Sequence, residues 1–389
     1  MAMIESAHHR GSHRHLLAAH DAPESDDPID AIIVPTVRPA VYLKHAVSQA
    51  RKLGCPLIAL ASGRYYQQGF HDLRRACEPD TEVHALIVAD PADLALPALR
   101  TSTVPPPELR RGTDTAAKRN LGLVLARRLG WRRVIFLDDD ISVPAPGDLR
   151  KAAGLLGTYS AVGLSVGGFP DNSVACHAFR AVGGHQETFV GGGALAIDAG
   201  HVSFFPDIYN EDWFYLLEDD GLRQLAVTGA VKQHPYDPFR TVERAKSEEF
   251  GDVLAEGVFW LLDEGRSPHE ADLEHWRKFL GRRAMFLRDI LAEIPGCPAD
   301  PGEKARMAAA LRAALRRHEL ITPELCVRYL RAWRADRETW RDFVARLRPA
   351  SSVEGAMERL TLKGRPRLAA LHLAGRTNLT KKLEPLGGS

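Results

Sequence analysis

The sequence lacks the long apolar run that a membrane-spanning helix requires. No stretch of its 389 residues approaches about 18 consecutive apolar residues, and the N-terminus lacks the charged and then apolar layout of a secretory signal peptide. Cysteine is also scarce, because the five cysteines are odd in number, widely scattered and include no Cys-x-x-Cys pair. This pattern argues against both a disulfide framework and a cysteine-based zinc site. A soluble cytoplasmic protein is the expectation.

The composition and the net charge are not extreme. The chain is 45% hydrophobic and 26% charged, with a formal net charge of +1, which is ordinary for a globular protein. Its length favours two domains over one. Residues 266–389 hold 25 Lys and Arg against 15 Asp and Glu, so the first 265 residues hold 26 against 35. We expect the acidic N-terminal part and the basic C-terminal part of the chain to have different functions.

The texture of the sequence changes twice. Residues 1–28 are rich in histidine and polar residues without periodicity, which predicts a disordered leader. Residues 29–265 alternate apolar strands with helical segments, and residues 266–389 follow an Arg- and Ala-rich helical pattern. The expected organisation is therefore a leader, an α/β domain and a basic α-helical domain with those boundaries.

Short apolar segments alternate with helical ones along the acidic part of the chain. We expect strands over residues 31–34, 56–63, 82–90 and 134–137, strands or strand–loop segments over 160–169, 189–198 and 224–233, and helices over 41–54, 113–130, 210–220 and 241–265. This order is typical of right-handed βαβ units around a mostly parallel sheet flanked by helices. In such sheets ligands bind at the carboxyl ends of the strands.

The run VIFLDDDIS, residues 134–142, leads a buried strand directly into three carboxylates. Two carboxylates about 4 Å apart repel by roughly 4 kcal/mol at an effective dielectric of about 20, so solvent, basic side chains or a bound cation must offset the repulsion. A strand ending in Asp-x-Asp, here Asp138 and Asp140, suits a divalent cation that also binds a diphosphate. A solvated acidic turn is the alternative, but the apolar neighbours Ile141 and Val143 favour a functional role.

Six segments of the chain together resemble a known family. IIVPTVRP, LIALASG, AAKRNLGLVLARRLG, VIFLDDDI, VGGGALAID and NEDWFYL resemble, in that order, the nucleotide-sugar glycosyltransferases of the GT-A fold, family 2 type. The resemblance covers roughly residues 30–240. It implies a Rossmann-like GT-A domain, a UDP- or GDP-sugar donor, a hydroxyl acceptor that is a small molecule, and Mn²⁺ or Mg²⁺. The Gln-x-x-Arg-Trp motif and the membrane helices of the processive members are missing, so a single transfer is expected.

The resemblance assigns donor-binding roles to several segments. The loop after the first strand and the end of the second would hold the base and ribose, and the basic segment before the acidic triplet would meet the diphosphate. Asp138 would contact the nucleotide, and Asp139 stays open in role because three consecutive acids leave the register uncertain by one residue. The donor-side residues are Pro35, Thr36, Arg38, Ser62, Gly63, Lys118, Arg119, Asn120, Asp138 and Asp139. For Lys118, the basic face of a plain amphipathic helix competes with this interpretation.

Metal-binding and catalytic roles also follow from the resemblance. Asp140 and Asp138 would ligate the metal, and His234 would complete the site by likeness to glucosyl-3-phosphoglycerate synthases, unless it is a simple loop histidine. An imidazole ligand would favour Mn²⁺ over Mg²⁺. Glu211 and Asp212 match the family's acidic pair, in which the aspartate takes the proton of the acceptor hydroxyl. Helix capping by the same residues is a second, compatible interpretation.

The acceptor side is expected at a glycine-rich stretch. Gly191, Gly192 and Gly193 permit close approach of the backbone to a ligand, and in the family this stretch borders the acceptor. Trp213 would offer a sugar-stacking face or else belong to the core.

Alternative functions stay open. An inverting transfer with Asp212 as base competes with a retaining one of the glucosyl-3-phosphoglycerate synthase type, which the His234 likeness favours. A nucleotidyltransferase ranks lower, because PTVRP lacks the glycines of the loop such enzymes carry. A non-enzymatic scaffold would use the basic helices to bind an anionic surface. Nucleic acid is not the expected partner, because the interleaved aromatic and basic residues of single-strand binders are missing. The C-terminal helices could instead mediate a homodimer.

Overall fold

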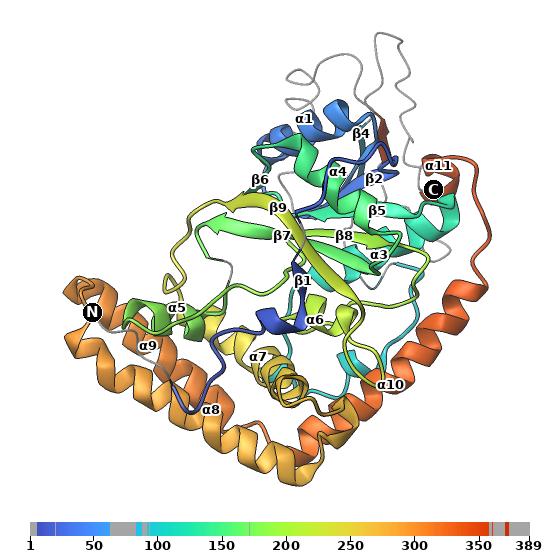
Figure 1. Ribbon diagram of the computed structural model, residues 1–389. Helices are drawn as coiled ribbons and strands as arrows, with labels where there is room; N and C mark the ends of the chain where they lie inside the picture. The colour runs from blue at the N-terminus through green and yellow to red at the C-terminus, as the bar shows by residue number, and fades with distance from the viewer. Residues whose placement is uncertain are drawn as a thin grey trace, which may run out of the picture.

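The computed structural model describes residues 6–19, 21–62, 83–87, 92, 94–170, 172–357, 360 and 370–372. Gly63, predicted to lie at the donor site, falls outside the described residues. A mixed sheet occupies the centre of the molecule, and long helices border one side of it (Figure 1). This arrangement confirms the predicted α/β class with an additional C-terminal helical region.

Ten strands of the described residues form one sheet. They are β1 (Ala18–Ala19), β2 (Ala31–Thr36), β3 (Leu57–Ala61), β4 (Val83–Ile87), β5 (Arg133–Leu137), β6 (Ile141–Ser142), β7 (Ala161–Gly168), β8 (Ala194–Asp198), β9 (Leu225–Gln233) and β10 (Ala370–His372). Their spatial order is β1–β9–β7–β8–β5–β2–β3–β4–β10, with β6 paired to β9. The half β5–β2–β3–β4 is parallel, whereas β8 runs antiparallel to both of its neighbours.

Helices cover both faces of this sheet. They are α1 (Lys44–Leu53), α3 (Thr115–Leu129), α4 (Pro146–Leu155), α5 (Val174–Ala181), α6 (Glu211–Leu216), α7 (Val242–Asp263), α8 (Leu273–Glu293), α9 (Pro301–His318), α10 (Pro323–Ala345) and α11 (Val353–Met357), with 3-10 turns η1 (Arg14–Leu16), η2 (Ala40–Leu43), η4 (Arg100–Ser102), η5 (Pro107–Leu109), η6 (Pro268–Glu270) and η7 (Ile294–Gly296). Gly130 ends α3 in the left-handed conformation (φ 70°), as predicted. Within the described chain, no helix has the length and apolarity needed to cross a membrane.

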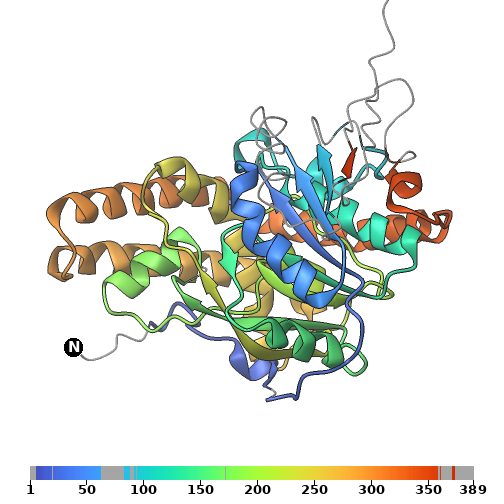
Figure 2. The same cartoon turned by 90° about the horizontal axis from the view of Figure 1, so that it is seen from above.

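The central strands are buried on both faces because their side chains alternate between two hydrophobic clusters. In β2, Ile33 packs with α3 on one face, and Ile32 packs with α1 and α4 on the other. Phe136 and Ile135 of β5 repeat this alternation. The continuous apolar runs of the sequence follow from this two-sided burial, and Figure 2 shows the helices above and below the strands.

The C-terminal helices share the core of the sheet. Phe214 of α6 meets the rings of Tyr329 and Trp333 of α10 at centroid distances of 6.0 and 5.7 Å, and all three belong to the cluster that also contains Phe136. The hydrophobic core therefore continues across the boundary predicted at residue 265, between the expected units 29–265 and 266–389.

The N-terminal segment differs from the disordered leader predicted over residues 1–28. Residues 6–19 pack against the domain, and β1 pairs in parallel with β9. The His13 side chain is buried, and its Nδ1 lies 2.8 Å from Asp263 Oδ2. The segment docks through individual histidine contacts, which leave no periodicity in the sequence for a prediction to use.

Candidate functional site

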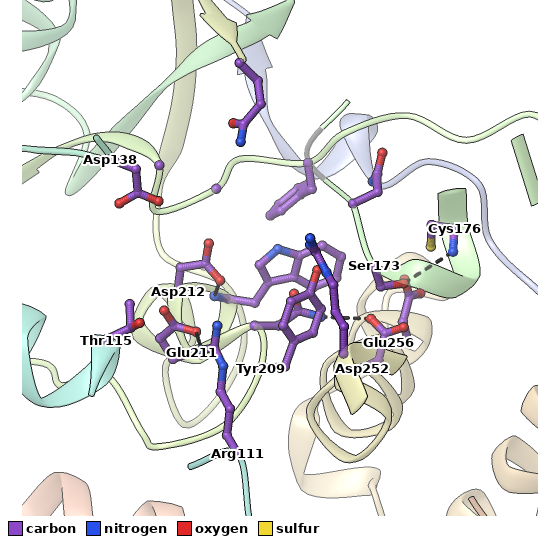
Figure 3. Close-up of a pocket in the computed structure, with 18 of the residues that line it drawn as sticks. Arg111, Thr115, Asp138, Ser173, Cys176, Tyr209, Glu211, Asp212, Asp252 and Glu256 are labelled. Atoms are coloured by element: carbon purple, nitrogen blue, oxygen red, sulfur yellow. Dashed lines mark hydrogen bonds and ion pairs between the residues drawn. The ribbon is translucent and has the colours of Figure 1, made fainter. Parts of the chain in front are cut away.

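A cleft with a cavity volume of about 360 Å³ opens beside the carboxyl end of β5 (Figure 3). A second pocket of about 170 Å³ lies next to it, beyond the end of β2. Asp138 and Asp140 line both spaces, whereas Asp139 lines only the smaller one. The three consecutive aspartates thus separate into a pair at the junction of the two pockets and a single residue facing the β2 loop.

Backbone pairing fixes the position of the triplet. The Asp138 N–H donates to Gly193 O at 2.9 Å, and the His234 N–H donates to Asp140 O at 2.9 Å. Ile141 follows at once in β6, which pairs with the end of β9. The loop is therefore held on two sides, and its carboxylates project from a rigid sheet edge.

Basic side chains meet each of the three carboxylates. Arg119 Nη2 donates to Asp138 Oδ1 at 3.0 Å. Arg38 donates to Asp139 at 2.7 Å and to Asp140 at 2.9 Å, and the Thr36 hydroxyl also donates to Asp139. Burial raises the pKa of Asp139, while Thr36 and Arg38 oppose that shift. Basic side chains, rather than solvent or a cation alone, therefore offset the repulsion among the three carboxylates. The repulsion by itself is no argument for a metal.

The two arginines differ in how firmly they are held. The Arg119 side chain is 4% exposed, and a second bond of 2.9 Å ties it to Glu211 Oε1. The Arg38 side chain is 37% exposed and comes from the loop after β2. Arg119 is thus an enclosed part of the site, whereas Arg38 is the more exposed of the two cations.

The acidic pair Glu211 and Asp212 opens α6, and the preceding Asn210 takes a left-handed conformation with φ 59°. Asparagine tolerates this conformation better than most residues. The Asn210 side chain donates to Asp252 of α7 at 3.1 Å, which holds the turn. The strained residue aims the first turn of α6 into the cleft.

The two acids of this pair have opposite environments. Burial disfavours ionisation of Glu211, but Arg111 and Arg119 outweigh it and lower its pKa. Desolvation raises the pKa of Asp212, and the neighbouring Glu211 charge raises it further. Glu211 is therefore a fixed anion inside a pair of arginines, and Asp212 is the carboxylate suited to exchange a proton.

Two backbone N–H groups hold the Asp212 carboxylate. Gly192 donates to Oδ2 at 2.5 Å, and Trp213 donates to Oδ1 at 3.0 Å. A Cβ added at Gly192 would lie 2.0 Å from Arg119 Nη1, so only glycine leaves room for that guanidinium. Among Gly191, Gly192 and Gly193, Gly192 therefore joins Asp212 to Arg119, while Gly193 pairs with the aspartate loop.

Several predicted donor residues turn out to hold the framework. The Asn120 amide exchanges two hydrogen bonds of 2.8 Å with the backbone of Phe205 and lies away from both pockets. Lys118 Nζ donates to Thr36 O at 2.8 Å and to Ser62 Oγ at 2.7 Å, which joins the ends of β2 and β3. Both are buried. Asn120 therefore acts as a brace, whereas Lys118 joins the two strands and also lines the smaller pocket.

Other predicted residues lie around the same spaces. Pro35 and Thr36 line the smaller pocket with Arg38, and Trp213 lines the main cleft. The Trp213 ring also packs on Phe259 at 4.4 Å between centroids, so it serves core and cleft together. The His234 side chain is exposed, and its neighbour Gln233 lines the cleft.

The remaining walls of the cleft carry residues that the sequence did not single out. Arg111 donates to Glu211 at 2.5 Å and to Ile208 O at 2.9 Å. Arg244 lies over the Tyr236 ring at 4.3 Å, and both line the main cleft. They belong to loops and to a long helix whose patterns carry no motif, so only the fold brings them together.

Comparisons with known proteins find matches among solved structures only. No protein family matches the sequence, and no curated protein matches it. Among solved structures, the chain is similar to the mannosyltransferase PcManGT from Pyrobaculum calidifontis in complex with GDP-Man and Mn²⁺, with 15% identity, 82% of this chain and 89% of that chain covered, and a TM-score of 0.39. The mannosyltransferase Ktr4p from S. cerevisiae aligns with 9% identity over 48% of this chain and 62% of that chain, at a TM-score of 0.25. At these levels the functional argument rests on the geometry of this chain.

Proposed function

We propose that the chain is a metal-dependent, non-processive glycosyltransferase that moves one sugar from a nucleoside-diphosphate sugar to an acceptor hydroxyl. One observation carries the proposal: the same cleft is lined by the strand-end pair Asp138 and Asp140 and by Asp212, a carboxylate with a raised pKa. A sugar whose diphosphate lies at the pair would present its anomeric carbon to the side of the cleft where Asp212 stands.

The smaller pocket suits the nucleoside. It lies against Pro35, Thr36 and Asp139, where a ribose hydroxyl can donate to the carboxylate. Because it opens at Asp138 and Asp140 into the larger cleft, a nucleotide there would extend its diphosphate toward the junction. The two volumes therefore correspond to a nucleoside and to a sugar with its acceptor.

The residues at the junction fit a divalent ion. Asp138 and Asp140 offer hard carboxylate oxygens, which Mg²⁺ and Mn²⁺ accept together with phosphate oxygens. Their side chains are 32% and 17% exposed, and Arg38 is the cation that the ion would replace at Asp140. When bound, the ion would neutralise the departing diphosphate. Arg119 would keep Asp138 oriented throughout.

Asp212 is the proposed base of an inverting transfer. It takes the proton of the acceptor hydroxyl as the oxygen bonds to the anomeric carbon and the bond to the diphosphate oxygen breaks. The N–H groups of Gly192 and Trp213 orient the carboxylate. Glu211 does not take this role, because Arg111 and Arg119 keep it ionised and enclosed.

A retaining transfer is the second candidate, and the position of His234 favours it. The backbone of His234 lies beside Asp140 through the β6–β9 pairing, where a turn of its side chain would add an imidazole to the metal ligands. The configuration of the product distinguishes the two outcomes, and NMR of the anomeric proton measures it.

A thermal-shift panel tests the proposed function. UDP, GDP and their sugars, GDP-mannose included, are added with and without Mn²⁺. A ligand at about 100 times its Kd adds roughly 2.7 kcal/mol of stability. We expect a nucleoside diphosphate to stabilise the chain, and to do so only when Mn²⁺ is present. Asp140→Asn should lose that effect, and the exposed-site control Asp220→Asn should keep it. Stabilisation that is independent of Mn²⁺, or unchanged in Asp140→Asn, would overturn the proposal.

A further inference from the structure

The N-terminal segment brings a buried imidazole to a cluster that is distinct from the aspartate triplet. His9 is 8% exposed, and its ring stacks on Phe286 of α8 at 4.1 Å with an interplanar angle of 19°. Gln186 Oε1 lies 2.5 Å from His9 Nε2, which fixes the ring. The His9 side chain is thus buried, stacked and hydrogen-bonded.

His9 meets a cysteine and a glutamate from two other elements. Cys176 of α5 and Glu256 of α7 are buried, and the potential ligand atoms of the three residues all lie within 4.8 Å of one another. Ligands around a tetrahedral zinc ion are roughly 3.4–3.8 Å apart, from bonds of about 2.0–2.3 Å. Shifts of about 1 Å or less in the side chains would complete that geometry.

The chemistry of the three ligands selects a class of metal. Imidazole, thiolate and carboxylate together are a set that zinc and cobalt accept, whereas magnesium and calcium prefer oxygen alone. Cys176 and Glu256 also line the main cleft, so a water molecule can reach a fourth position from that side. Gln186 would act as the outer partner that orients a ligating imidazole.

The surrounding charge also favours a cation. Glu249, Asp252 and Glu256 are buried along one face of α7, and Arg283 pairs with the first two at 2.8 and 2.7 Å. Glu256 instead has the imidazole of His13 at 3.3 Å. A dication would balance a Cys176 thiolate and share the Glu256 carboxylate with His13, without disturbing the Arg283 pairs.

We infer that His9, Cys176 and Glu256 form a binding site for a zinc-type divalent ion, separate from the aspartate triplet, which fastens the N-terminal segment to α5 and α7. On binding, the thiol of Cys176 releases its proton to solvent and its sulfur bonds to the metal. The same segment carries His13, which lines the cleft beside Trp213. The ion therefore secures one wall of the proposed acceptor side.

Cobalt titration of the full chain tests the site. A thiolate bound to Co²⁺ gives a near-ultraviolet charge-transfer band, which the all-oxygen triplet cannot produce, so the outcome is independent of the proposed transfer function. The wild-type chain should show the band at one ion per chain, and zinc should displace it. Absence of the band from the folded wild-type protein would overturn the inference.

Matched variants separate the site from adventitious binding. Cys176→Ser should abolish the band and His9→Ala should weaken metal affinity by about tenfold or more. Cys297→Ser and His8→Ala, which change another buried cysteine and the adjacent partly exposed histidine, should bind as the wild type does. A band that persists in Cys176→Ser, or that Cys297→Ser removes, contradicts the assignment.

Limited trypsin digestion tests the fastening role. Zinc should slow cleavage after Arg14, whose side chain is 63% exposed, in the wild-type chain but not in Cys176→Ser. Equal cleavage rates in the wild-type chain with and without zinc would show that the ion does not hold the segment.

Discussion

Replacing Asp212 by asparagine tests the proposed base with almost no change of shape. The carboxylate accepts from Gly192 N at 2.5 Å and from Trp213 N at 3.0 Å. An amide has one acceptor oxygen, so one of these N–H groups would face an NH₂ group. Losing one hydrogen bond to a charged acceptor costs about 1.5–3 kcal/mol, and relief of repulsion from Glu211 offsets part of it. We expect a net loss of about 1–2 kcal/mol in unfolding free energy.

The kinetic effect should be much larger than the effect on stability. Loss of a positioned general base lowers the rate by about 10²–10⁴-fold, which corresponds to roughly 2.7–5.4 kcal/mol in activation free energy. Nucleoside-diphosphate affinity should stay within about twofold, because Asp212 lies apart from the smaller pocket. The assay measures kcat for transfer and the Kd of the diphosphate separately, using the donor found in the thermal-shift panel.

The pH profile supplies an independent readout. The pKa of Asp212 is raised by desolvation and by Glu211, and Arg119 opposes the shift. As pH falls, the base form is therefore lost at a higher pH than for an ordinary aspartate, and kcat should fall with it. Asp212→Asn should lack this acidic limb. The role would be refuted if kcat of Asp212→Asn stayed within tenfold of the wild type, or if its pH profile were unchanged. Asp220→Asn, which changes a 95% exposed side chain, is the neutral control.

Three further changes test the framework of the site. Arg38→Met removes the more exposed cation and should tighten the binding of Mn²⁺ alone by about fivefold, since a half-exposed ion pair contributes roughly 1 kcal/mol. A calorimetric titration measures this affinity, and weaker binding would contradict the expectation. Gly192→Ala places a Cβ 2.0 Å from Arg119 Nη1 and should cost about 1–3 kcal/mol in urea unfolding, whereas Gly221→Ala, with open space around it, should change stability by less than about 0.5 kcal/mol. Asn120→Ala loses two hydrogen bonds to the backbone and should lower the unfolding free energy by about 2–4 kcal/mol, while diphosphate affinity stays constant. A weaker affinity in the folded variant would show that Asn120 contributes to donor binding.

The sequence predicted the central strands well because β2, β3 and β5 are buried on both faces. Ile135 and Phe136 point to opposite clusters, so apolar residues fill every position from Val134 to Leu137. Helices α4 and α5 of the same domain were not predicted. The sequence could not predict how the C-terminal helices join the core. The contact of Phe214 with Tyr329 and Trp333 links segments more than a hundred residues apart, and a helical pattern shows only that one face is apolar, not what that face meets.

The candidate site was predictable only where a motif marks a strand end or a helix start. The positions of Asp138, Asp140 and Asp212 follow from such local signals, and they line one cleft. Other walls of the site did not follow, because ion pairs such as Arg111 with Glu211 join a loop to a helix at long range. The N-terminal contacts of His13 were missed for the same reason.

The three consecutive aspartates are each paired with an arginine, so the cluster is balanced before any metal binds. Arg119 holds Asp138 in place, because the guanidinium is enclosed and also bound to Glu211. Arg38 serves both Asp139 and Asp140 and is the more exposed cation, so it can yield Asp140 to an incoming ion while Thr36 continues to donate to Asp139. An ion that arrives with a diphosphate would thus exchange one cation for another. The Asp140 carboxylate would then stay paired throughout, which avoids the penalty of an uncompensated buried charge.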